Sequence, residues 1–514
     1  MNRAPTNEPN PRIAHKWKVL ISVVFGTFMV ILDTTVVNVA FQTLRHEFDA
    51  PIADAQWIIS LYVLVLGIAT PLAGFLADRF GIKRAYLSGL ALFTFGSVLC
   101  GLAPSLAWLV TARAIQGLGG GFCVPLGSAQ LLRTFPAREQ GRALGVFGIV
   151  IVLAPAMGPV VGGALVDLGL WRWIFFVNVP IGILGITLGS RFLREFASPH
   201  TIHMDWLGLV TEMIGFGAIL FAASIAEVEG WTSPRTQLWL MTGLLGLAAF
   251  AFVELRIAKH PLLDLRLFRR RTFLIASLVG YASIIALFGA EFLMPLYLQM
   301  LRGTSALEAG LILLPMAMAA GIASPTAGRI YDHTGPRPLL VIGFILLSIN
   351  TWQFSLLDAN TPIPWVMTLL AIRGAALGLT VQTTFVAALS VVAGPALARG
   401  TSLVNATRNV VQSLGVALLA TVLASTLSPQ TRRIQLDVLS PVEADSSITG
   451  LCRPTGLAGP LFDAARQTAC AESVRGFELA YRLTFVAALL ALFLATMLPG
   501  WPAPWGGRTS HHPD

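Results

Sequence analysis

The sequence predicts an all-α protein that crosses a membrane many times. Three observations support this: the composition, a regular succession of long apolar runs, and short clusters of basic residues between those runs. Of its 514 residues, 55% are hydrophobic and only 12% are charged, and the mean hydropathy is +0.73. An ordinary water-soluble domain of this length would expose too much apolar surface at that composition. Lipid is therefore the expected solvent for most of the chain.

Fourteen runs of mostly apolar residues recur along the chain. Each is about twenty residues long, enough for a helix to cross a hydrocarbon core of about 30 Å. The first run is too long for the core of a signal peptide and has no small-residue cleavage site behind it, so we expect it to remain as a membrane helix. The predicted spans are 17–40, 56–77, 84–103, 106–128, 142–165, 173–193, 205–226, 236–256, 273–297, 308–328, 337–357, 364–390, 401–426 and 479–498.

The predicted spans group into two bundles of six helices with two further helices inserted between them. A long polar loop interrupts the second bundle before its last span. The expected divisions are an N-terminal tail (1–16), a first bundle (17–193), an inserted pair (205–256), a second bundle (273–498) with its loop at 427–478, and a C-terminal tail (499–514).

Basic residues predict the orientation, because Lys and Arg are retained in the cytoplasm. They cluster in the tails and in alternate loops, whereas the opposite short loops contain only Arg45, Arg172, Arg235 and Arg302. Loop 427–478 also carries arginines, but long loops are translocated largely regardless of charge. We therefore expect both termini in the cytoplasm and the chain in the inner membrane. The net charge of +9 needs no nucleic acid to explain it, because the basic clusters lack interleaved aromatic residues.

An internal repeat links the two predicted bundles. Gly, Asp, Gly and a basic residue recur at a constant offset of 254 residues, and each copy closes the second span of its bundle. The matching residues are Gly74, Asp78, Gly81 and Lys83 in the first copy, and Gly328, Asp332, Gly335 and Arg337 in the second. Two related halves of this kind place a substrate site between bundles that rock around it.

The first copy of this repeat resembles the signature loop of the major facilitator superfamily, which joins the second and third helices. Asp78 with Arg79, Lys83 and Arg84 is expected to make charge contacts with neighbouring helix ends and so to hold one access state. The resemblance implies the fold of that superfamily, with fourteen membrane helices in this chain.

Further motifs resemble the fourteen-span drug/proton antiporters within that superfamily. They are the run Leu32–Ala40, the segment Leu109–Gly120 with Arg113, the segment Ala154–Gly163 with Gly158, Pro159, Gly162 and Gly163, and the segment Trp171–Gly182. Ala154 replaces the first glycine of its motif, and Gln42 lies near the site of a missing proline. The resemblance implies efflux of amphipathic, cationic compounds by antiport, whereas simple helix packing is the alternative for the Gly158 motif.

Asp33 is the strongest candidate for proton coupling. An ionised carboxylate inside a span is costly unless it is paired, so this residue can bind either a proton or a cation. In the antiporter family the arginine corresponding to Arg113 takes part in proton coupling. The alternative is a structural carboxylate paired with Arg113 or Asn38.

Glu291 is a second candidate, because it lies in the first helix of the second bundle at nearly the depth of Asp33. Arg373 and Arg408 are intramembrane charges that could pair with it. A glutamate facing solvent near the outer helix end is the alternative. Glu212, in the inserted pair, is expected to serve helix packing or the lipid interface.

Cys452 and Cys470 both lie in loop 427–478, where an oxidising exterior permits a disulfide; two free thiols are the alternative.

No metal, cofactor or nucleotide site is predicted, and neither an enzyme nor an ATP-driven pump fits the motifs. The expected partners are a small-molecule substrate, protons and membrane lipid, and the expected state is a monomer. A dedicated exporter of one natural product, siderophore or lipid would share every motif, and a membrane-embedded enzyme or sensor is a weaker alternative.

Overall fold

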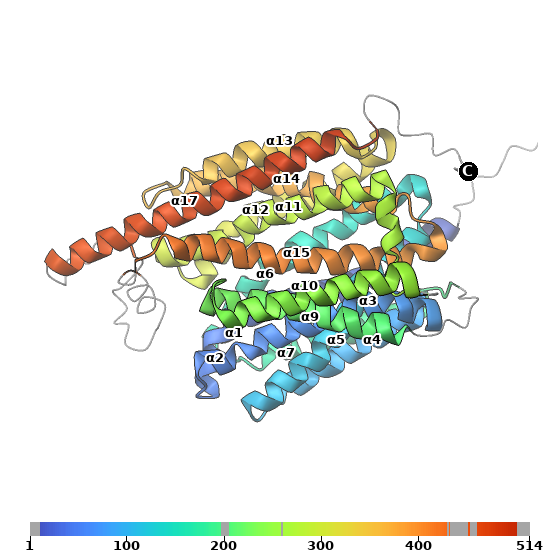
Figure 1. Ribbon diagram of the computed structural model, residues 1–514, viewed down its shortest axis with the longest axis horizontal. Coiled ribbons are helices and arrows are strands. Elements are labelled where there is room, and N and C mark those ends of the chain that lie inside the picture. The colour runs from blue at the N-terminus through green and yellow to red at the C-terminus, as the bar shows by residue number, and fades with distance from the viewer. Residues whose placement is uncertain are drawn as a thin grey trace, which may run out of the picture.

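The computed structural model describes residues 11–196, 205–258, 261–428, 431, 451–452 and 460–500. Most of the two expected tails and of loop 427–478 lies outside these residues. The described chain is helical throughout, and in Figure 1 its long helices run side by side along one axis.

The first bundle contains six long helices. α1 begins at Pro11, six residues before the predicted span, and a short helix precedes two of the others. Its elements are α1 (Pro11–Glu47), α2 (Ile52–Ala55), α3 (Trp57–Phe80), α4 (Ile82–Gly101), α5 (Leu106–Thr134), α6 (Gln140–Asp167), α7 (Trp173–Phe176) and α8 (Asn178–Phe192).

The inserted pair and the second bundle complete the fold, and two of their helices end in a π-helical turn. The inserted elements are α9 (Trp206–Glu229), α10 (Pro234–Phe252) and the turn η2 (Val253–Ile257). The second bundle comprises α11 (Arg271–Leu296) with its turn η4 (Tyr297–Leu301), α12 (Ala306–Thr334), α13 (Pro336–Phe354), α14 (Ile363–Leu389), α15 (Leu397–Ser425) and α17 (Pro460–Thr496).

Twelve helices within the described residues are long and apolar enough to cross a membrane. The two remaining predicted spans correspond to α5 and α11. α5 has 29 residues but carries polar side chains, among them Arg113, Gln116, Gln130 and Arg133. The apolar stretch of α11 with described side chains, Arg271–Leu287, is shorter. The count of fourteen spans therefore remains a prediction for these two helices.

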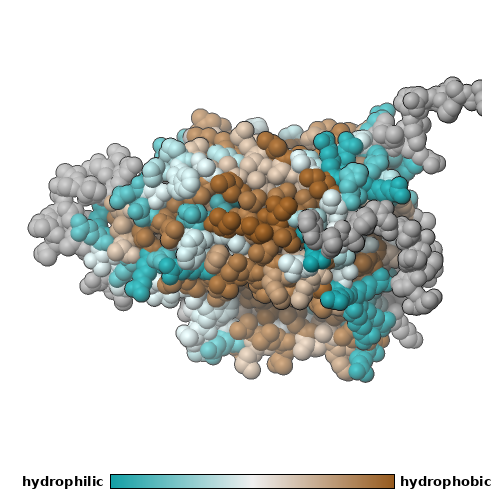
Figure 2. Space-filling view, turned by 90° about the horizontal axis from the view of Figure 1, so that it is seen from above, coloured by the Kyte–Doolittle hydropathy of each residue, from teal (hydrophilic) through white to brown (hydrophobic). Residues whose placement is uncertain are grey.

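The exposed surface fits a lipid environment. Figure 2 shows hydrophobic residues across the middle of the molecule and hydrophilic residues towards its two ends. On α10, for example, Leu238, Met241, Leu245 and Phe252 are all exposed. Apolar side chains that water would disfavour are stable against acyl chains, so this surface is the expected membrane-facing one.

The two bundles meet along two seams, one between α3 and α15 and the other between α6 and α12. Glycines of the repeat lie at both. A Cβ at Gly74 would lie 3.0 Å from Cα of Arg399, and a Cβ at Gly328 would lie 2.2 Å from the carbonyl oxygen of Gly141. Only glycine permits this backbone approach, which explains why the motif begins with it.

The inserted pair lies over the seam between α3 and α15, because α9 contacts both helices (Figure 1). Ser60 of α3 and Ser224 of α9 are hydrogen-bonded at 3.1 Å, and Nε1 of Trp231 donates to Oγ1 of Thr421 on α15 at 2.6 Å. The two inserted helices are therefore attached to both halves.

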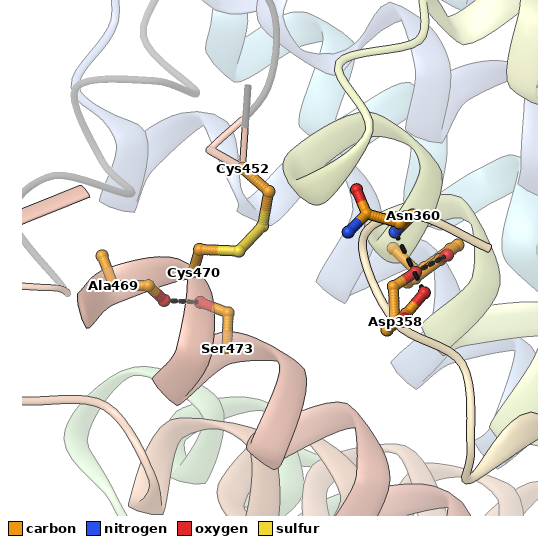
Figure 3. Close-up of a disulfide and its surroundings, with 7 residues drawn as sticks. Asp358, Asn360, Cys452, Ala469, Cys470 and Ser473 are labelled. Carbon is orange, nitrogen blue, oxygen red and sulfur yellow. Dashed lines mark hydrogen bonds between the residues drawn. A yellow bond between two sulfur atoms is a disulfide. The ribbon is translucent and has the colours of Figure 1, made fainter. Parts of the chain in front are cut away.

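A disulfide joins Cys452 to Cys470 on α17, with a Cα–Cα distance of 5.2 Å (Figure 3). The backbone N–H of the preceding Leu451 donates to the carbonyl of Met300 at 2.7 Å. The bridge thus connects the turn at the end of α11 to the first part of α17. The other two cysteines, Cys100 and Cys123, are free and buried.

Candidate functional site

A closed hydrogen-bond network surrounds Asp33 in the middle of α1. Its side chain is 1% exposed, and its Oδ2 atom forms an ion pair with Nη1 of Arg113 on α5. Oδ1 accepts hydrogen bonds from Nε2 of Gln116 at 2.8 Å and from Nδ2 of Asn178 on α8 at 2.7 Å. Both carboxylate oxygens are therefore satisfied by side chains of the first bundle.

Arg113 is equally buried and makes several contacts besides Asp33. Its Nε donates to the carbonyl of Ile58 at 3.1 Å, and its Nη1 donates to Oε1 of Gln116 at 2.6 Å. The guanidinium lies 3.8 Å from the ring centroid of Tyr62, a cation–π contact in a desolvated setting. Arg113 and Gln116 reach one carboxylate because residues three apart share a helix face.

The network decides between the partners proposed for Asp33. Asn38 is exposed on α1, whereas Arg113 is the ion-pair partner. The Asp33 carboxylate is paired with one cation and accepts hydrogen bonds from two amides. Protonation of Asp33 would remove this pairing and leave the buried Arg113 charge to its remaining contacts. Such an arrangement can convert proton binding into a change of helix contacts.

Gln116, Asn178, Ser97 and Tyr62 complete the network, and none of them was among the predicted site residues. Nε2 of Gln116 also donates to Oγ of Ser97 on α4, at 2.7 Å. The available signal was that Gln116 and Asn178 lie inside the motifs of the fourth and sixth spans, as polar residues in otherwise apolar segments.

In the second bundle, Arg373 of α14 is fully buried and contacts α11. Its Nη2 donates to the carbonyls of Ala286 and Leu287, and its Nη1 donates to Oγ1 of Thr351 at 3.0 Å. Glu291 follows one turn later on α11, but its side chain lies outside the described residues. Arg408 lines a cavity between α11, α14 and α15 together with Tyr281.

The first copy of the repeat connects the two halves. Asp78, at the end of α3, forms an ion pair with Arg399 in the first turn of α15. Lys83 and Arg84 act through their backbone, because their N–H groups donate to the carboxylate of Glu195 at 3.1 and 3.2 Å. Gly81 has φ +94°, which permits the turn into α4.

The side chains of Lys83 and Arg79 make different contacts. Lys83 Nζ donates to the carbonyl of Ser190 at 2.7 Å, and Arg79 stacks over Phe80. The sequence analysis expected charge contacts between this loop and neighbouring helix ends. The structure shows such a contact between the two halves in the ion pair of Asp78 with Arg399.

The second copy makes the corresponding contact in the other direction. Oδ1 and Oδ2 of Asp332, at the end of α12, accept hydrogen bonds from the backbone N–H groups of Gly141 and Arg142 at 2.9 and 3.0 Å. These donors lie in the first turn of α6, where free N–H groups and the helix dipole favour an anion. Gly335 has φ +80° and begins α13, whose first turn contains Arg337. Both aspartates therefore close the same end of the molecule, here called the basic end.

The glycines of the Ala154–Gly163 motif differ in their surroundings. A Cβ at Gly158 would lie 2.1 Å from Oγ1 of Thr35, and one at Gly162 would lie 3.1 Å from the carbonyl of Val36, so both pack α6 on α1. Pro159 faces Gly310 of α12, whereas Gly163 has nothing within 4 Å of the added atom. One side of this motif therefore packs on α1 at Thr35, two residues from Asp33. Its other side lies at the seam with α12.

Residues 23–416 match the family model described as Major Facilitator Superfamily, and this stretch covers most of the chain. The chain belongs to the major facilitator superfamily. As a member of this superfamily, it is expected to place its substrate between the two bundles.

Relatives within the superfamily include proteins named for resistance. The chain is 31% identical over 486 residues to the multidrug resistance protein B homolog of Mycobacterium tuberculosis, covering 93% of this chain and 88% of the relative. It is 31% identical over 353 residues to the lincomycin resistance protein LmrB of Bacillus subtilis, covering 68% and 74%. The xylose transporter XylE from E. coli shares the fold, with a TM-score of 0.57 at 13% identity over 95% of this chain and 99% of that chain.

Proposed function

We propose that this chain exports amphipathic, cationic compounds across the inner membrane in exchange for protons. The buried network of Asp33 and Arg113 carries the proposal, because it is a site at which protonation changes a charge inside the first bundle. Relatives named as multidrug resistance proteins support export rather than uptake. The proposed working unit is a monomer surrounded by lipid.

The proposed coupling step is the protonation of Asp33 from the outer side. A neutral Asp33 no longer pairs with Arg113, and breaking a buried ion pair costs about 3–5 kcal/mol. That energy is large enough to shift an equilibrium between two packings of the bundles. Proton entry from outside would displace cationic cargo from the carboxylate, and release of the proton to the cytoplasm would restore the pair.

The conformational change is proposed to pass from α1 to α6. Thr35 lies two residues from Asp33 and packs against Gly158, while the first turn of α6 is bound by Asp332 of the other half. A shift of α1 would therefore reach the basic end through one continuous helix. In this alternating-access scheme, the contacts of Asp78 and Asp332 hold the basic end closed and separate when it opens.

The proposed topology has fourteen spans, with α5 and α11 crossing the membrane like the other twelve. The basic end, with both termini, faces the cytoplasm, and the disulfide end faces the exterior. Glu291 is proposed as a second protonation site, because Arg373 binds the α11 backbone one turn before it.

Reconstitution in liposomes tests the proposal. Addition of a cationic compound should release protons from vesicles that contain the wild-type chain, and Asp33→Asn should abolish this release. Asp167→Asn is the matched control, because Asp167 is an exposed carboxylate at the end of α6. Proton-coupled transport by Asp33→Asn at the wild-type rate would refute the coupling role.

A panel of neutral and cationic compounds separates the alternatives. Transport of many unrelated cations supports a multidrug exporter, whereas transport of one compound class identifies a dedicated exporter. Dissipating the proton gradient should stop either activity.

A further inference from the structure

Three acidic residues gather in the inserted helix pair, far along the chain from Asp33. Asp205 precedes α9 and Glu212 lies two turns into it, while Glu254 belongs to the turn η2 that follows α10. Positions 205, 208 and 212 share one helix face. A Cβ at Gly208 would lie 2.4 Å from Oδ2 of Asp205 and 3.1 Å from Oε1 of Glu254. This group is called the acidic column.

The carboxylates of the acidic column are buried and poorly satisfied. Glu212 is 0% exposed and Glu254 is 1% exposed. Neither oxygen of Glu212 has a hydrogen-bond partner among the described residues, and the same holds for Oε2 of Glu254 and Oδ2 of Asp205. The remaining two oxygens accept backbone N–H groups, from Leu262 at 3.1 Å and from Gly208 at 2.8 Å. Of the two roles expected for Glu212, its burial fits helix packing rather than the lipid interface.

Among the described residues, no cation is hydrogen-bonded to the unsatisfied oxygens of this column. α3 carries no charged residue between Trp57 and Ala77. On α15, Arg399 pairs with Asp78, and Arg408 lines the cavity beside Tyr281. Near Glu254 in the chain, Arg256 and Arg266 are exposed, and Asp264 adds negative charge.

An ionised carboxylate with no partner in an apolar setting costs several kcal/mol, and two close together cost more. One proton removes a charge and converts one acceptor oxygen into an O–H donor. A protonated Glu212 is neutral, so its charge no longer adds to that of Glu254. A metal ion is a poorer fit, because the described residues contain no group of three or more His, Cys, Asp or Glu side chains placed to hold one.

We propose that Glu212 and Glu254 form a proton-binding site in the inserted pair, separate from Asp33, that holds one proton at neutral pH. The proton prevents two negative carboxylate charges from being buried together at the interface between α9 and α10. Loss of the proton at alkaline pH loosens this interface and, through the contacts of α9, the cover over the seam between α3 and α15.

Infrared difference spectroscopy of the purified full-length protein in lipid nanodiscs tests the site. At neutral pH, the wild-type spectrum minus that of Glu212→Gln should contain the C=O stretching band of one protonated carboxylic acid. Glu47→Gln, which alters an exposed carboxylate on α1, should give only carboxylate bands. Carboxylate bands alone in the Glu212→Gln difference at neutral pH would overturn the proposal.

Alkaline titration provides a second measurement that does not depend on the folding of a variant. The carboxylic acid band of the wild-type protein should disappear as the pH rises, and Glu254→Gln should alter the pH at which it disappears. Over this range the unfolded chain binds fewer protons than the folded chain, so thermal stability should fall with rising pH. Glu212→Gln should flatten that fall. A wild-type band that is insensitive to alkaline pH, or an equally steep fall in folded Glu212→Gln, would contradict a titrating site.

Discussion

Replacing Gly328 with alanine should open the seam between α6 and α12 at the basic end. The added methyl carbon would lie 2.2 Å from the carbonyl oxygen and 2.7 Å from the carbonyl carbon of Gly141. These contacts are about 1 Å or more too short, and neither atom belongs to a flexible side chain that could move away. The substitution therefore penalises the closed packing and leaves an open packing unaffected.

The magnitude follows from the cost of inserting a methyl group into a packed interface, about 1–3 kcal/mol. Such an energy shifts a two-state equilibrium about 5- to 150-fold towards the open basic end. Alanine otherwise favours a helix over glycine by about 1 kcal/mol, so α12 itself should not be weakened. Gly163→Ala on α6 is the matched control, because its added carbon has nothing within 4 Å.

A cysteine at Ser324 can report the change. Ser324 is 2% exposed on α12, and its Oγ donates to the carbonyl of Gly145 across the seam. Both variants and their parent would carry Ser324→Cys and be treated in nanodiscs with a hydrophilic maleimide. Labelling should be faster in Gly328→Ala than in the parent, and unchanged in Gly163→Ala. Equal labelling in Gly328→Ala and the parent would refute the steric argument for this seam.

Three further predictions concern the network, the second seam contact and the disulfide. Asn178→Leu removes one hydrogen-bond donor from Asp33, and hydrogen bonds to charged groups contribute about 1.5–3 kcal/mol. The pH profile of transport should therefore move to higher pH. An unchanged profile would exclude Asn178 from the coupling site. Asp332→Asn weakens the anion at the α6 N-terminus, so cysteine labelling at the basic end should increase, by less than in Gly328→Ala. Cys452→Ser opens a loop of about 18 residues, and the loss of this constraint on the unfolded chain should cost about 3 kcal/mol of stability. The purified variant should therefore unfold at a lower temperature. A reducing agent should lower the unfolding temperature of the wild type and leave that of the variant unchanged.

The repeat predicted which aspartates matter but not what they bind. Asp78 and Asp332 are recognisable as equivalents because their spacing to neighbouring glycines is preserved at an offset of 254. Their partners lie 321 and about 190 residues away, one of them a side chain and the other a pair of backbone N–H groups. A backbone donor carries no mark in the sequence, so no motif could have indicated the second contact.

The network around Asp33 was partly visible in the sequence. A carboxylate and an arginine, each inside an apolar run, are costly enough that a mutual pairing was one expected solution. The choice between Arg113 and Asn38 depended on the direction in which α1 faces its neighbours. The amides of Gln116 and Asn178 come from different helices, and only their packing shows that they meet at one oxygen atom.

The amino-acid sequence alone predicts a membrane protein with two related halves and an inserted pair, and it indicates Asp33 and the two aspartates of the repeat as candidate functional residues. Hydropathy, helix length and repeat spacing are local properties, so they can be seen without a fold. The folded structure is needed to see which buried charges are paired and which, like Glu212, have no partner among the described residues. That outcome depends on contacts between helices that are distant in the chain, because the cost of burying a charge is set by the groups around it rather than by its neighbours in sequence.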